Sequence, residues 1–320
     1  MDRVKYDIFC IGACVQDILL EGIEEEDFQN SVTVLKRAVF TSGGDATNEA
    51  VVLSRLGNKT ALLAKIDTGM AGNAIYQDLR NEGVDTSQIV WDENSRSTSA
   101  FVAIDSAGNH KFFLAKGENE GIALNEIDCE GLKNTRAVCV GSMYTSYHLD
   151  RCGMRELMQA AREAGAVTFA DMDHDVEKLG PHAMDHVLPY VDYLLPSIDE
   201  AVYITGEQDE RKAAAEILRR GVKTVVIKLG AKGCYVRDAK TEFYMDPFCI
   251  EAKDTTGCGD NFAAGFIHSV LKGRTLEESA RFACAVGAVN STQIGGHMAV
   301  RSESQIEEFM NTASQRRIER

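Results

Sequence analysis

The chain contains little proline, tryptophan or excess positive charge, and it has no long apolar segment. It has 4 prolines and 1 tryptophan among 320 residues, and neither a low-complexity linker nor an internal repeat is visible. No uninterrupted apolar run approaches the roughly 20 residues that a membrane-spanning helix needs. The net charge of −15 at pH 7 disfavours nucleic acids and anionic membranes as partners.

The 9 cysteines are scattered without close pairs, and their number is odd. A framework of disulfides would call for paired cysteines, so this usage favours reduced thiols. The N-terminal residues also lack a signal-peptide pattern, because the first apolar run is short and typical of a strand. We therefore expect a cytoplasmic protein.

Apolar segments typical of strands alternate with segments that have helical periodicity. The predicted strands cover residues 7–14, 59–66, 137–141, 167–170, 191–195, 224–229 and 243–252. The predicted helices include residues 71–82, 150–164, 210–220 and 275–290. Several strands are continuous apolar runs, which indicates a sheet covered on both faces. The pattern predicts an α/β fold with a mostly parallel, doubly wound central sheet between two helical layers.

Two regions interrupt this alternation. Residues 17–40 contain short alternating pieces, with Val32 and Val34 among them, and residues 98–115 are typical of a hairpin with its turn at 105–109. Segments that share this character could form one small sheet, which we expect to be separate from the central one. A peripheral hairpin on the main sheet is the alternative.

A glycine-rich motif, DTTGCGD, occupies residues 254–260 and precedes apolar positions at helical spacing. It predicts a turn between the last strand and a helix. Gly257 and Gly259 allow a sharp turn, and the N–H groups at a helix N-terminus can hold an anion. The Asp260 carboxylate is placed to accept a proton from a hydroxyl group. An anion site beside a base is what phosphoryl transfer to an alcohol needs, and a structural turn is the alternative.

A second glycine motif, TSGGDATN, occupies residues 41–48 and opens another predicted helix, which ends near Gly57. Gly43 and Gly44 would permit the close approach of a small polar molecule. Asn48 offers the donors and acceptors that suit a sugar hydroxyl. A capped surface helix with a solvated asparagine is the alternative.

Together, GGDATN and DTTGCGD resemble the N-terminal and C-terminal motifs of the ribokinase-like (PfkB) carbohydrate kinase family. The resemblance covers essentially the whole chain. It implies one kinase domain over residues 1–320 with a three-layer α/β/α fold and a small β-sheet lid, formed by residues 15–42 and 96–116. It also implies that the γ-phosphoryl group of ATP is transferred to a sugar hydroxymethyl group, and that two subunits pair through the lid.

The resemblance also implies the roles of individual residues. Asp260 is the expected base. The backbone N–H groups of Gly257, Cys258 and Gly259 are the expected anion hole, and the Cys258 thiol would be open to alkylation if it is exposed. The expected substrate-binding residues are Gly12, Asp17, Gly43, Gly44 and Asn48. The hydroxymethyl group is expected between Asn48 and Asp260.

The implied cofactors are ATP and Mg²⁺, together with a K⁺ ion whose presence the sequence leaves open. The expected nucleotide-binding residues are Ser197, Lys228, Gly230, Gly233, Cys284 and Asn290. Ser197 stands where the family usually has asparagine, and a helix N-cap is its alternative role. Glu200 is expected to hold Mg²⁺ through water, because Mg²⁺ keeps much of its water shell. The implied K⁺ ligands are Asp254, Thr256, Asn290, Gln293 and Gly295.

The sequence leaves the substrate open. Residues 171–175 contain no arginine where sugar-acid kinases of the family tend to carry one, so we expect an uncharged sugar such as a ketohexose or a pentose. A sugar acid or a nucleoside is the alternative, since Arg96, Lys111 or Lys116 on the lid could supply a positive charge. A sugar- or nucleotide-binding protein that has lost catalysis is the non-enzymatic alternative.

Two further patterns indicate other kinds of site, but with less support than the glycine motifs. His182 and His186 lie four residues apart, as in a metal site on one helix face, but no third ligand is well placed and a structural or solvated role is favoured. A dinucleotide-binding oxidoreductase would need the GxGxxG pattern after the first strand. The chain has Gly12 there without the other glycines.

Overall fold

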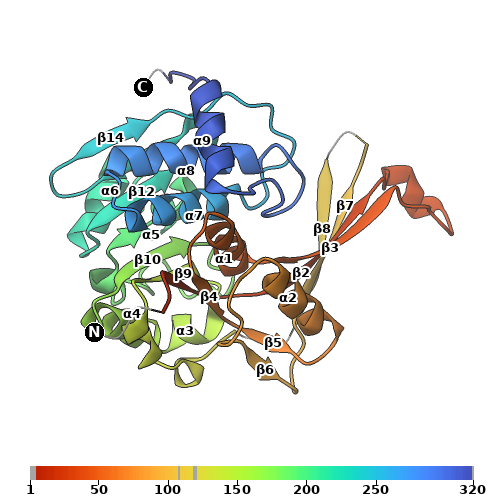
Figure 1. Ribbon diagram of the computed structural model, residues 1–320, viewed down its shortest axis with the longest axis horizontal. Helices are drawn as coiled ribbons and strands as arrows, with labels where there is room; N and C mark the ends of the chain where they lie inside the picture. Colours follow the sequence, from red (N-terminus) through yellow and green to blue (C-terminus); the bar gives the residue numbers. More distant parts are fainter. Residues whose placement is uncertain (1–4, 107–108, 118–120, 319–320) are drawn as a thin grey trace.

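The computed structural model describes residues 5–106, 109–117 and 121–318, and Figure 1 shows a body built around a large sheet with a smaller sheet projecting from it. The large sheet has eight strands in the order β14-β13-β12-β11-β10-β9-β1-β4. Neighbours from β4 to β12 pair in parallel, and β13 and β14 are antiparallel. Its strands are β1 (Ile8–Ile11), β4 (Thr60–Leu63), β9 (Ala137–Met143), β10 (Val167–Met172), β11 (Tyr193–Leu194), β12 (Thr224–Lys228), β13 (Cys234–Arg237) and β14 (Glu242–Met245).

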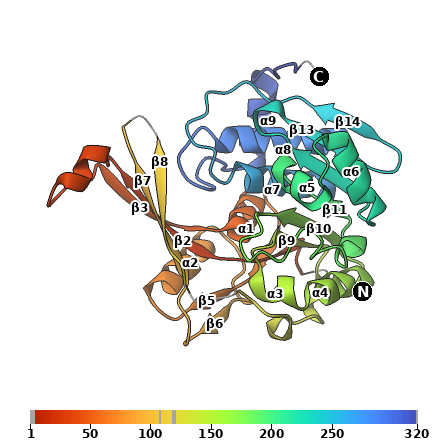
Figure 2. The same cartoon turned by 180° about the vertical axis from the view of Figure 1, so that it is seen from behind.

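Helices cover both faces of this sheet. On one face lie α1, α7 and α8, with α9 packed on α8, and on the other lie α4, α5 and α6, which Figure 2 shows from behind. The helices are α1 (Asp45–Arg55), α2 (Met70–Asn81), α3 (Tyr147–Arg151), α4 (Met154–Glu163), α5 (Ile198–Thr205), α6 (Glu210–Arg219), α7 (Cys258–Leu271), α8 (Leu276–Asn290) and α9 (Glu303–Thr312). Within the described ranges, no helix is both long and apolar enough to cross a membrane.

The core lies on the two faces of the central sheet, which explains the continuous apolar strands. In β1, Ile8 and Cys10 pack on one side, whereas Phe9 and Ile11 pack on the other. Successive side chains of a strand point to opposite faces, so a strand covered on both sides must be apolar at every position. The predicted three-layer α/β architecture is confirmed. All nine cysteines lie among the described residues, and none of them forms a disulfide bond.

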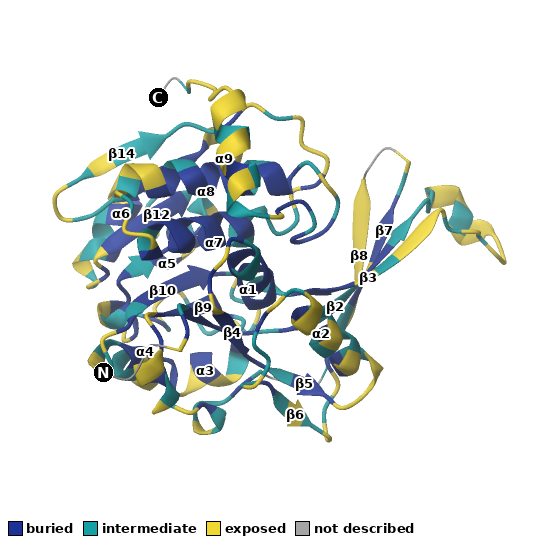
Figure 3. Ribbon diagram, viewed as in Figure 1, coloured by how far each residue is buried: buried dark blue, intermediate teal, exposed yellow. Residues whose placement is uncertain are grey.

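The smaller sheet is the predicted lid, with strand order β3-β2-β7-β8. Its strands are β2 (Val15–Glu21), β3 (Arg37–Gly43), β7 (Thr98–Ile104) and β8 (His110–Ala115). One face buries Leu19, Val102 and Ile104, whereas Figure 3 shows β8 exposed along its length. A third sheet pairs β5 (Lys65–Asp67) with β6 (Val90–Asp92). Two residues of the predicted hairpin turn, Ala107 and Gly108, lie outside the described residues.

Several predicted boundaries are wrong. The predicted strand at 59–66 is divided into β4 and β5, which belong to different sheets. The predicted strand at 243–252 ends at Met245, because Pro247 has no N–H to donate to a sheet. The predicted helix at 150–164 is divided into α3 and α4, since Gly153 adopts a left-handed backbone (φ +112°). Val32 and Val34 lie in an exposed segment between β2 and β3 rather than in a strand.

Candidate active site

The first turn of α7 is shaped by Gly257, which has a left-handed backbone (φ +68°) and caps the helix. A Cβ atom at this position would lie 2.0 Å from the carbonyl oxygen of Gly296, so a larger residue cannot fit. The Cys258 N–H donates to the Thr255 carbonyl oxygen at 3.2 Å. Within the described part of the chain, the N–H groups of Gly257 and Gly259 have no protein acceptor and are available to an anion.

Asp260 lies in this turn and is held by Asn48 of α1. Nδ2 of Asn48 donates to Oδ2 of Asp260 at 2.7 Å. Burial raises the pKa of Asp260, while the hydrogen bond from Asn48 and the charge of Lys228 act against that rise. The two glycine motifs therefore meet at this hydrogen bond. In this structure the amide donates directly to the carboxylate, and the expected position of the hydroxymethyl group beside both side chains stays a prediction.

Lys228 extends from the end of β12 toward the same turn. Its Nζ lies 2.6 Å from each carboxylate oxygen of Asp171, which is at the end of β10. The same Nζ is 3.3 Å from the position of a Cβ atom added to Gly259. Burial alone would lower the pKa of Lys228, but the Asp171 and Glu200 carboxylates outweigh it and hold the pKa above its usual value. Lys228 thus supplies a positive charge beside the anion-binding turn.

A cavity of about 600 Å³ lies beside this turn. This volume is within the range of small-molecule sites. Its lining includes four of the predicted nucleotide-binding residues, Lys228, Gly230, Gly233 and Cys284, together with Cys258 and Gly259. Gly230 has open space at its Cβ position, whereas a Cβ at Gly233 would lie 1.9 Å from the carbonyl oxygen of Met245. Ser197 and Asn290, also predicted to bind nucleotide, are not among the lining residues.

Ser197 is the N-cap of α5, as its alternative interpretation predicted. Its Oγ accepts the N–H of Glu200 at 3.3 Å, and Oε2 of Glu200 accepts the N–H of Ser197 at 2.6 Å. These reciprocal bonds form a capping box. The Ser197 hydroxyl therefore fixes the start of the helix that carries Glu200.

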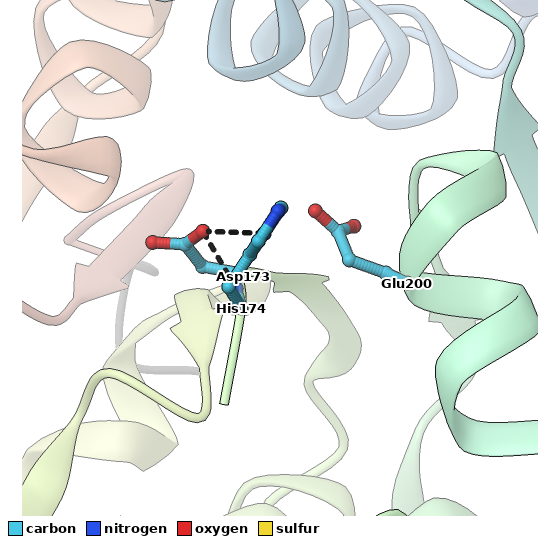
Figure 4. Close-up of side chains that lie close together, drawn as sticks. All are labelled: Asp173, His174 and Glu200. Atoms are coloured by element: carbon cyan, nitrogen blue, oxygen red, sulfur yellow. Dashed lines mark hydrogen bonds and ion pairs between the residues drawn. The ribbon is translucent and has the colours of Figure 1, made fainter. Parts of the chain in front are cut away.

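Figure 4 shows Glu200 facing His174, with Asp173 beside the imidazole. One ligand atom from each of these residues lies within 4.8 Å of the others. Two carboxylates suit Mg²⁺, and an imidazole is also accepted by transition metals such as Mn²⁺ or Zn²⁺. The donor set therefore fits a divalent cation at the position where Glu200 was predicted to hold one.

A second cavity, of about 330 Å³, opens at the start of α1. Two predicted substrate-binding residues, Gly12 and Gly44, line it. Thr98 and Leu114 of the lid also line it, so the lid covers this cavity. The other polar lining residues are Asp45, Lys65, Lys116, Ser142, Thr145, Ser146, Tyr147 and Asp173.

Asp17 and Gly43 lie side by side on paired strands of the lid. A Cβ atom at Gly43 would lie 2.2 Å from Oδ2 of Asp17, so glycine makes room for this carboxylate. Burial, together with the nearby Asp260, raises the pKa of Asp17 to about 7. Gly44 (φ +90°) likewise makes room for the carbonyl oxygen of Ala13. At both glycines, protein atoms fill the space that a side chain would occupy, whereas the sequence pattern predicted the close approach of a ligand there.

Four of the five predicted K⁺ ligands come together near this turn. The Asp254 carboxylate accepts the N–H groups of Thr256 and Gly295, each at 2.8 Å. Nδ2 of Asn290 donates to the Thr256 carbonyl oxygen at 2.9 Å. Its Oδ1 is buried with no hydrogen-bond partner among the described residues. Gln293 is exposed.

Two further expectations concern the reactivity of the Cys258 thiol and the role of His182 and His186. Burial raises the pKa of Cys258 to about 12, so little reactive thiolate exists at neutral pH. His182 and His186 are exposed, and His182 pairs with Asp185. Their predicted solvated role agrees with this placement.

Several residues at this site were not predicted to take part in it, namely Asp45, Asp171, Asp173, Gly296 and His297. The Asp171–Lys228 pair was foreseeable in part, because both residues end predicted strands of one parallel sheet and such ends meet at one edge. His297 carried no such signal. Its contact with Asn48 joins the loop after α8 to helix α1, which is distant in sequence.

Comparisons with known proteins agree with this geometry. The model of the pfkB family carbohydrate kinases matches residues 5–301. An uncharacterized sugar kinase from Archaeoglobus fulgidus is 31% identical over 236 residues, which are 74% of this chain and 92% of that protein. A ribokinase from Haemophilus influenzae is 27% identical over 276 residues, covering 85% of this chain and 88% of its own.

Solved structures share the fold. A protein assigned as ribokinase II from E. coli, solved with ATP and Mg²⁺, has a TM-score of 0.82 at 22% identity and covers 96% of this chain and 99% of its own. A ribokinase from Arabidopsis thaliana, complexed with ribose and ATP, has a TM-score of 0.77 at 21% identity, with coverages of 95% and 98%. At such identities these likenesses show the fold alone. The family match, over nearly the whole chain, shows that this protein belongs to the pfkB family of carbohydrate kinases, which are ATP-dependent phosphotransferases.

Proposed function

We propose that this protein transfers the γ-phosphoryl group of Mg-ATP to a hydroxymethyl group of an uncharged sugar, with Asp260 as the general base. The hydrogen bond between Asn48 and Asp260 carries this proposal. It joins α7, whose first residues line the 600 Å³ cavity, to α1, whose first residue lines the 330 Å³ cavity. The base therefore lies between a site of nucleotide size and a smaller polar site under the lid.

The proposed reaction is a direct in-line transfer. Asp260 accepts the proton of the sugar hydroxyl, the sugar oxygen forms a bond to the γ-phosphorus, and the bond from that phosphorus to the β,γ-bridging oxygen breaks to release ADP. The N–H groups at the start of α7 and the ammonium group of Lys228 face the transferred group and offset its negative charge. The lid over the smaller cavity limits the access of water, which would otherwise accept the phosphoryl group.

The site also has residues for the implied cations. Mg²⁺ would neutralise charge on the phosphate oxygens, and Glu200, Asp173 and His174 are the residues that would hold it, directly or through water. The buried Oδ1 of Asn290 and the carbonyl oxygen of Thr256 would face a K⁺ ion.

The lining of the smaller cavity favours an uncharged sugar. Asp45 and Asp173 contribute carboxylates, which accept sugar hydroxyls and repel anions. Lys65 and Lys116 also line the cavity, but Lys65 pairs with Glu126 at 2.7 Å and Lys116 lies 3.8 Å from Glu177. An anionic substrate would have to displace those partners.

The named relatives are consistent with this substrate class. They include the ribokinase of Haemophilus influenzae and a fructokinase from Solanum lycopersicum, which is 25% identical over 279 residues. Ribose and fructose are both uncharged.

The test is ADP release from Mg-ATP, with K⁺ present, against a panel of neutral sugars, sugar acids and nucleosides. We expect turnover with a neutral pentose or ketohexose. Turnover with a sugar acid or a nucleoside alone would contradict the proposed substrate class but keep the phosphotransfer. ATP binding without turnover on any compound of an extended panel would favour a protein that has lost catalysis.

We also propose that the protein is cytoplasmic and that it forms a dimer. The two subunits would pair through the outer face of the lid. Phe40, Phe101 and Phe113 lie in one cross-strand row with Ile18, and all three phenylalanines are exposed. A contiguous aromatic row on one face of a sheet is typical of a surface that another protein covers. Sedimentation should show a dimer that the Phe101→Lys substitution converts to a monomer. A wild-type monomer at micromolar concentration would refute the pairing.

A further inference from the structure

Two consecutive hydrogen bonds connect the loop after α8 to the Asp260 carboxylate. His297, 1% exposed, lies in this loop, and its Nδ1 is 2.8 Å from Oδ1 of Asn48. Nδ2 of the same amide lies 2.7 Å from Oδ2 of Asp260. A Cβ atom added to Gly296 would lie 2.8 Å from Oδ1 of Asn48. The loop therefore both packs against the amide and bonds to it.

The chemistry of the amide determines where the imidazole proton lies. The Asn48 group that faces the ionised carboxylate must be the NH₂ group, because a carboxylate accepts and does not donate. Its carbonyl oxygen then faces His297, so Nδ1 of the imidazole must carry a proton. Nε2 is left with a lone pair, 3.4 Å from the Thr41 hydroxyl on β3 of the lid. Burial, and then the charge of Arg55, lowers the pKa of His297 to about 4, which agrees with a neutral ring.

We propose that His297 is a positioning residue for the general base, because it holds the Asn48 amide with its NH₂ group toward Asp260. This inference rests on the proposed function of Asp260. If Asn48 were released, its amide could turn and present its oxygen to the carboxylate, which would lose a donor and gain a repulsive neighbour. The reacting hydroxyl would then meet a misplaced and less acidic carboxyl group.

The loss of this hydrogen bond has a predictable sign. A donor to a carboxylate favours the charged form, so removing it raises the pKa of the carboxyl group. Since the base must be ionised to accept a proton, the acid limb of kcat/KM against pH should move to higher pH. The other charged or titratable groups that face Asp260 are Cys258 from the same helix, Lys228 from β12, Asp17 from β2, Asp45 and Glu49 from α1, Asp171 from β10 and Asp173 just after it. Those that face His297 are Arg55 from α1, Asp78 from α2 and Glu82 at its C-terminus. None of them is altered by a substitution at His297.

The test compares His297→Leu, His297→Asn and His268→Leu with the wild type in the full kinase reaction. His297→Leu should lower kcat by roughly 10-fold to 100-fold, as expected for a misplaced catalytic group, and move the acid limb up by about one pH unit. His297→Asn can place an N–H near the former Nδ1 and should restore most of both quantities. His268→Leu is the matched control, because His268 is equally buried and is 2.8 Å from the Asn58 amide, away from the base. It should leave the acid limb unmoved.

Several outcomes would overturn the proposal. An unchanged kcat and acid limb in folded His297→Leu would do so, and so would a fall in activity without a shift of the limb, which would indicate a structural role only. Asp260→Asn is measured in parallel. If Asp260→Asn stays active, Asp260 is not the base and the proposed function is refuted. If activity is lost in Asp260→Asn but not in His297→Leu, only the role of His297 is refuted. Nitrogen NMR of histidine-labelled wild type needs no variant: the Nδ1–H tautomer of His297 is expected, and the Nε2–H tautomer would refute the proposal.

Discussion

At the scale of single residues, a group of buried acids surrounds the start of α7, and Lys228 is the cation placed among them. Its ammonium group bonds both oxygens of Asp171 and lies beside Gly259. A buried carboxylate needs such a partner, because burial penalises the charged form of an isolated acid. Lys228 therefore has two roles, to balance Asp171 in the resting protein and to face the phosphoryl group during transfer.

The substitution Lys228→Met tests the second role. We expect kcat to fall by about 10²–10³-fold, the usual cost of removing one group that stabilises charge in a transition state. Steady-state kinetics with saturating sugar and ATP would measure it, and Lys240→Met is the control, since Lys240 is exposed in a turn away from the site. Circular dichroism would show whether the unpaired Asp171 has unfolded the variant. A folded Lys228→Met protein with wild-type kcat would contradict this role.

At the scale of elements, the turn before α7 requires glycine at position 257 for two reasons, its backbone conformation and the closeness of the neighbouring loop. Gly257 and Gly273 both have left-handed backbones, with φ of +68° and +77°. An alanine Cβ at 257 would collide with the Gly296 carbonyl oxygen, whereas at 273 nothing lies within 4 Å. Only the first position therefore couples the helix start to the neighbouring loop.

Gly257→Ala and Gly273→Ala form a matched pair for measurement. Both should lose about 1–2 kcal/mol of unfolding free energy from the left-handed backbone. Gly257→Ala should lose more in total, because its Cβ clashes with the Gly296 carbonyl oxygen, and urea titration would measure both losses. Only Gly257→Ala should also lower kcat, by roughly 10²-fold, because the clash displaces the anion-binding turn. Equal activity of the two folded variants would show that the turn tolerates displacement.

The elements also show which structural features a local sequence pattern can predict. Glycine at a turn, followed by apolar positions at helical spacing, predicted the starts of α1 and α7 because those signals are local. The strand predicted at 243–252 is too long, because the aromatic and β-branched composition continues past Pro247. Pro247 has no N–H group to donate to a neighbouring strand. The bond between Asn48 and Asp260 and the contact of His297 with Asn48 depend on packing between distant segments, which no local pattern encodes.

At the scale of the whole molecule, the buried acids make stability depend on pH. Burial raises the pKa of Asp17 and of Asp150 to about 7, above the value of roughly 3.9 in an unfolded chain. Between these values the folded chain binds more protons than the unfolded one, so the free energy of unfolding falls as pH rises. Burial lowers the pKa of His268 and His297, which acts in the opposite direction, but only below about pH 6.5.

We therefore expect the free energy of unfolding to fall from about pH 7 to pH 8, where the histidines are largely neutral in both states and the acids still titrate. Urea titration of the ligand-free protein across this range would measure the slope. Asp150→Asn should reduce it, because that residue could no longer ionise. A free energy that rises over the same interval would mean that these carboxyl groups are not protonated in the folded protein.

The most direct measurement of the central claim is the turnover of Asp260→Asn on the sugar that the wild type phosphorylates. Asparagine keeps the size of the side chain but cannot accept the proton, and loss of a general base costs about 10²–10⁴-fold in rate. The account predicts a fall in kcat of that size, with ATP still bound at close to wild-type affinity. A folded Asp260→Asn protein with near wild-type kcat would contradict it.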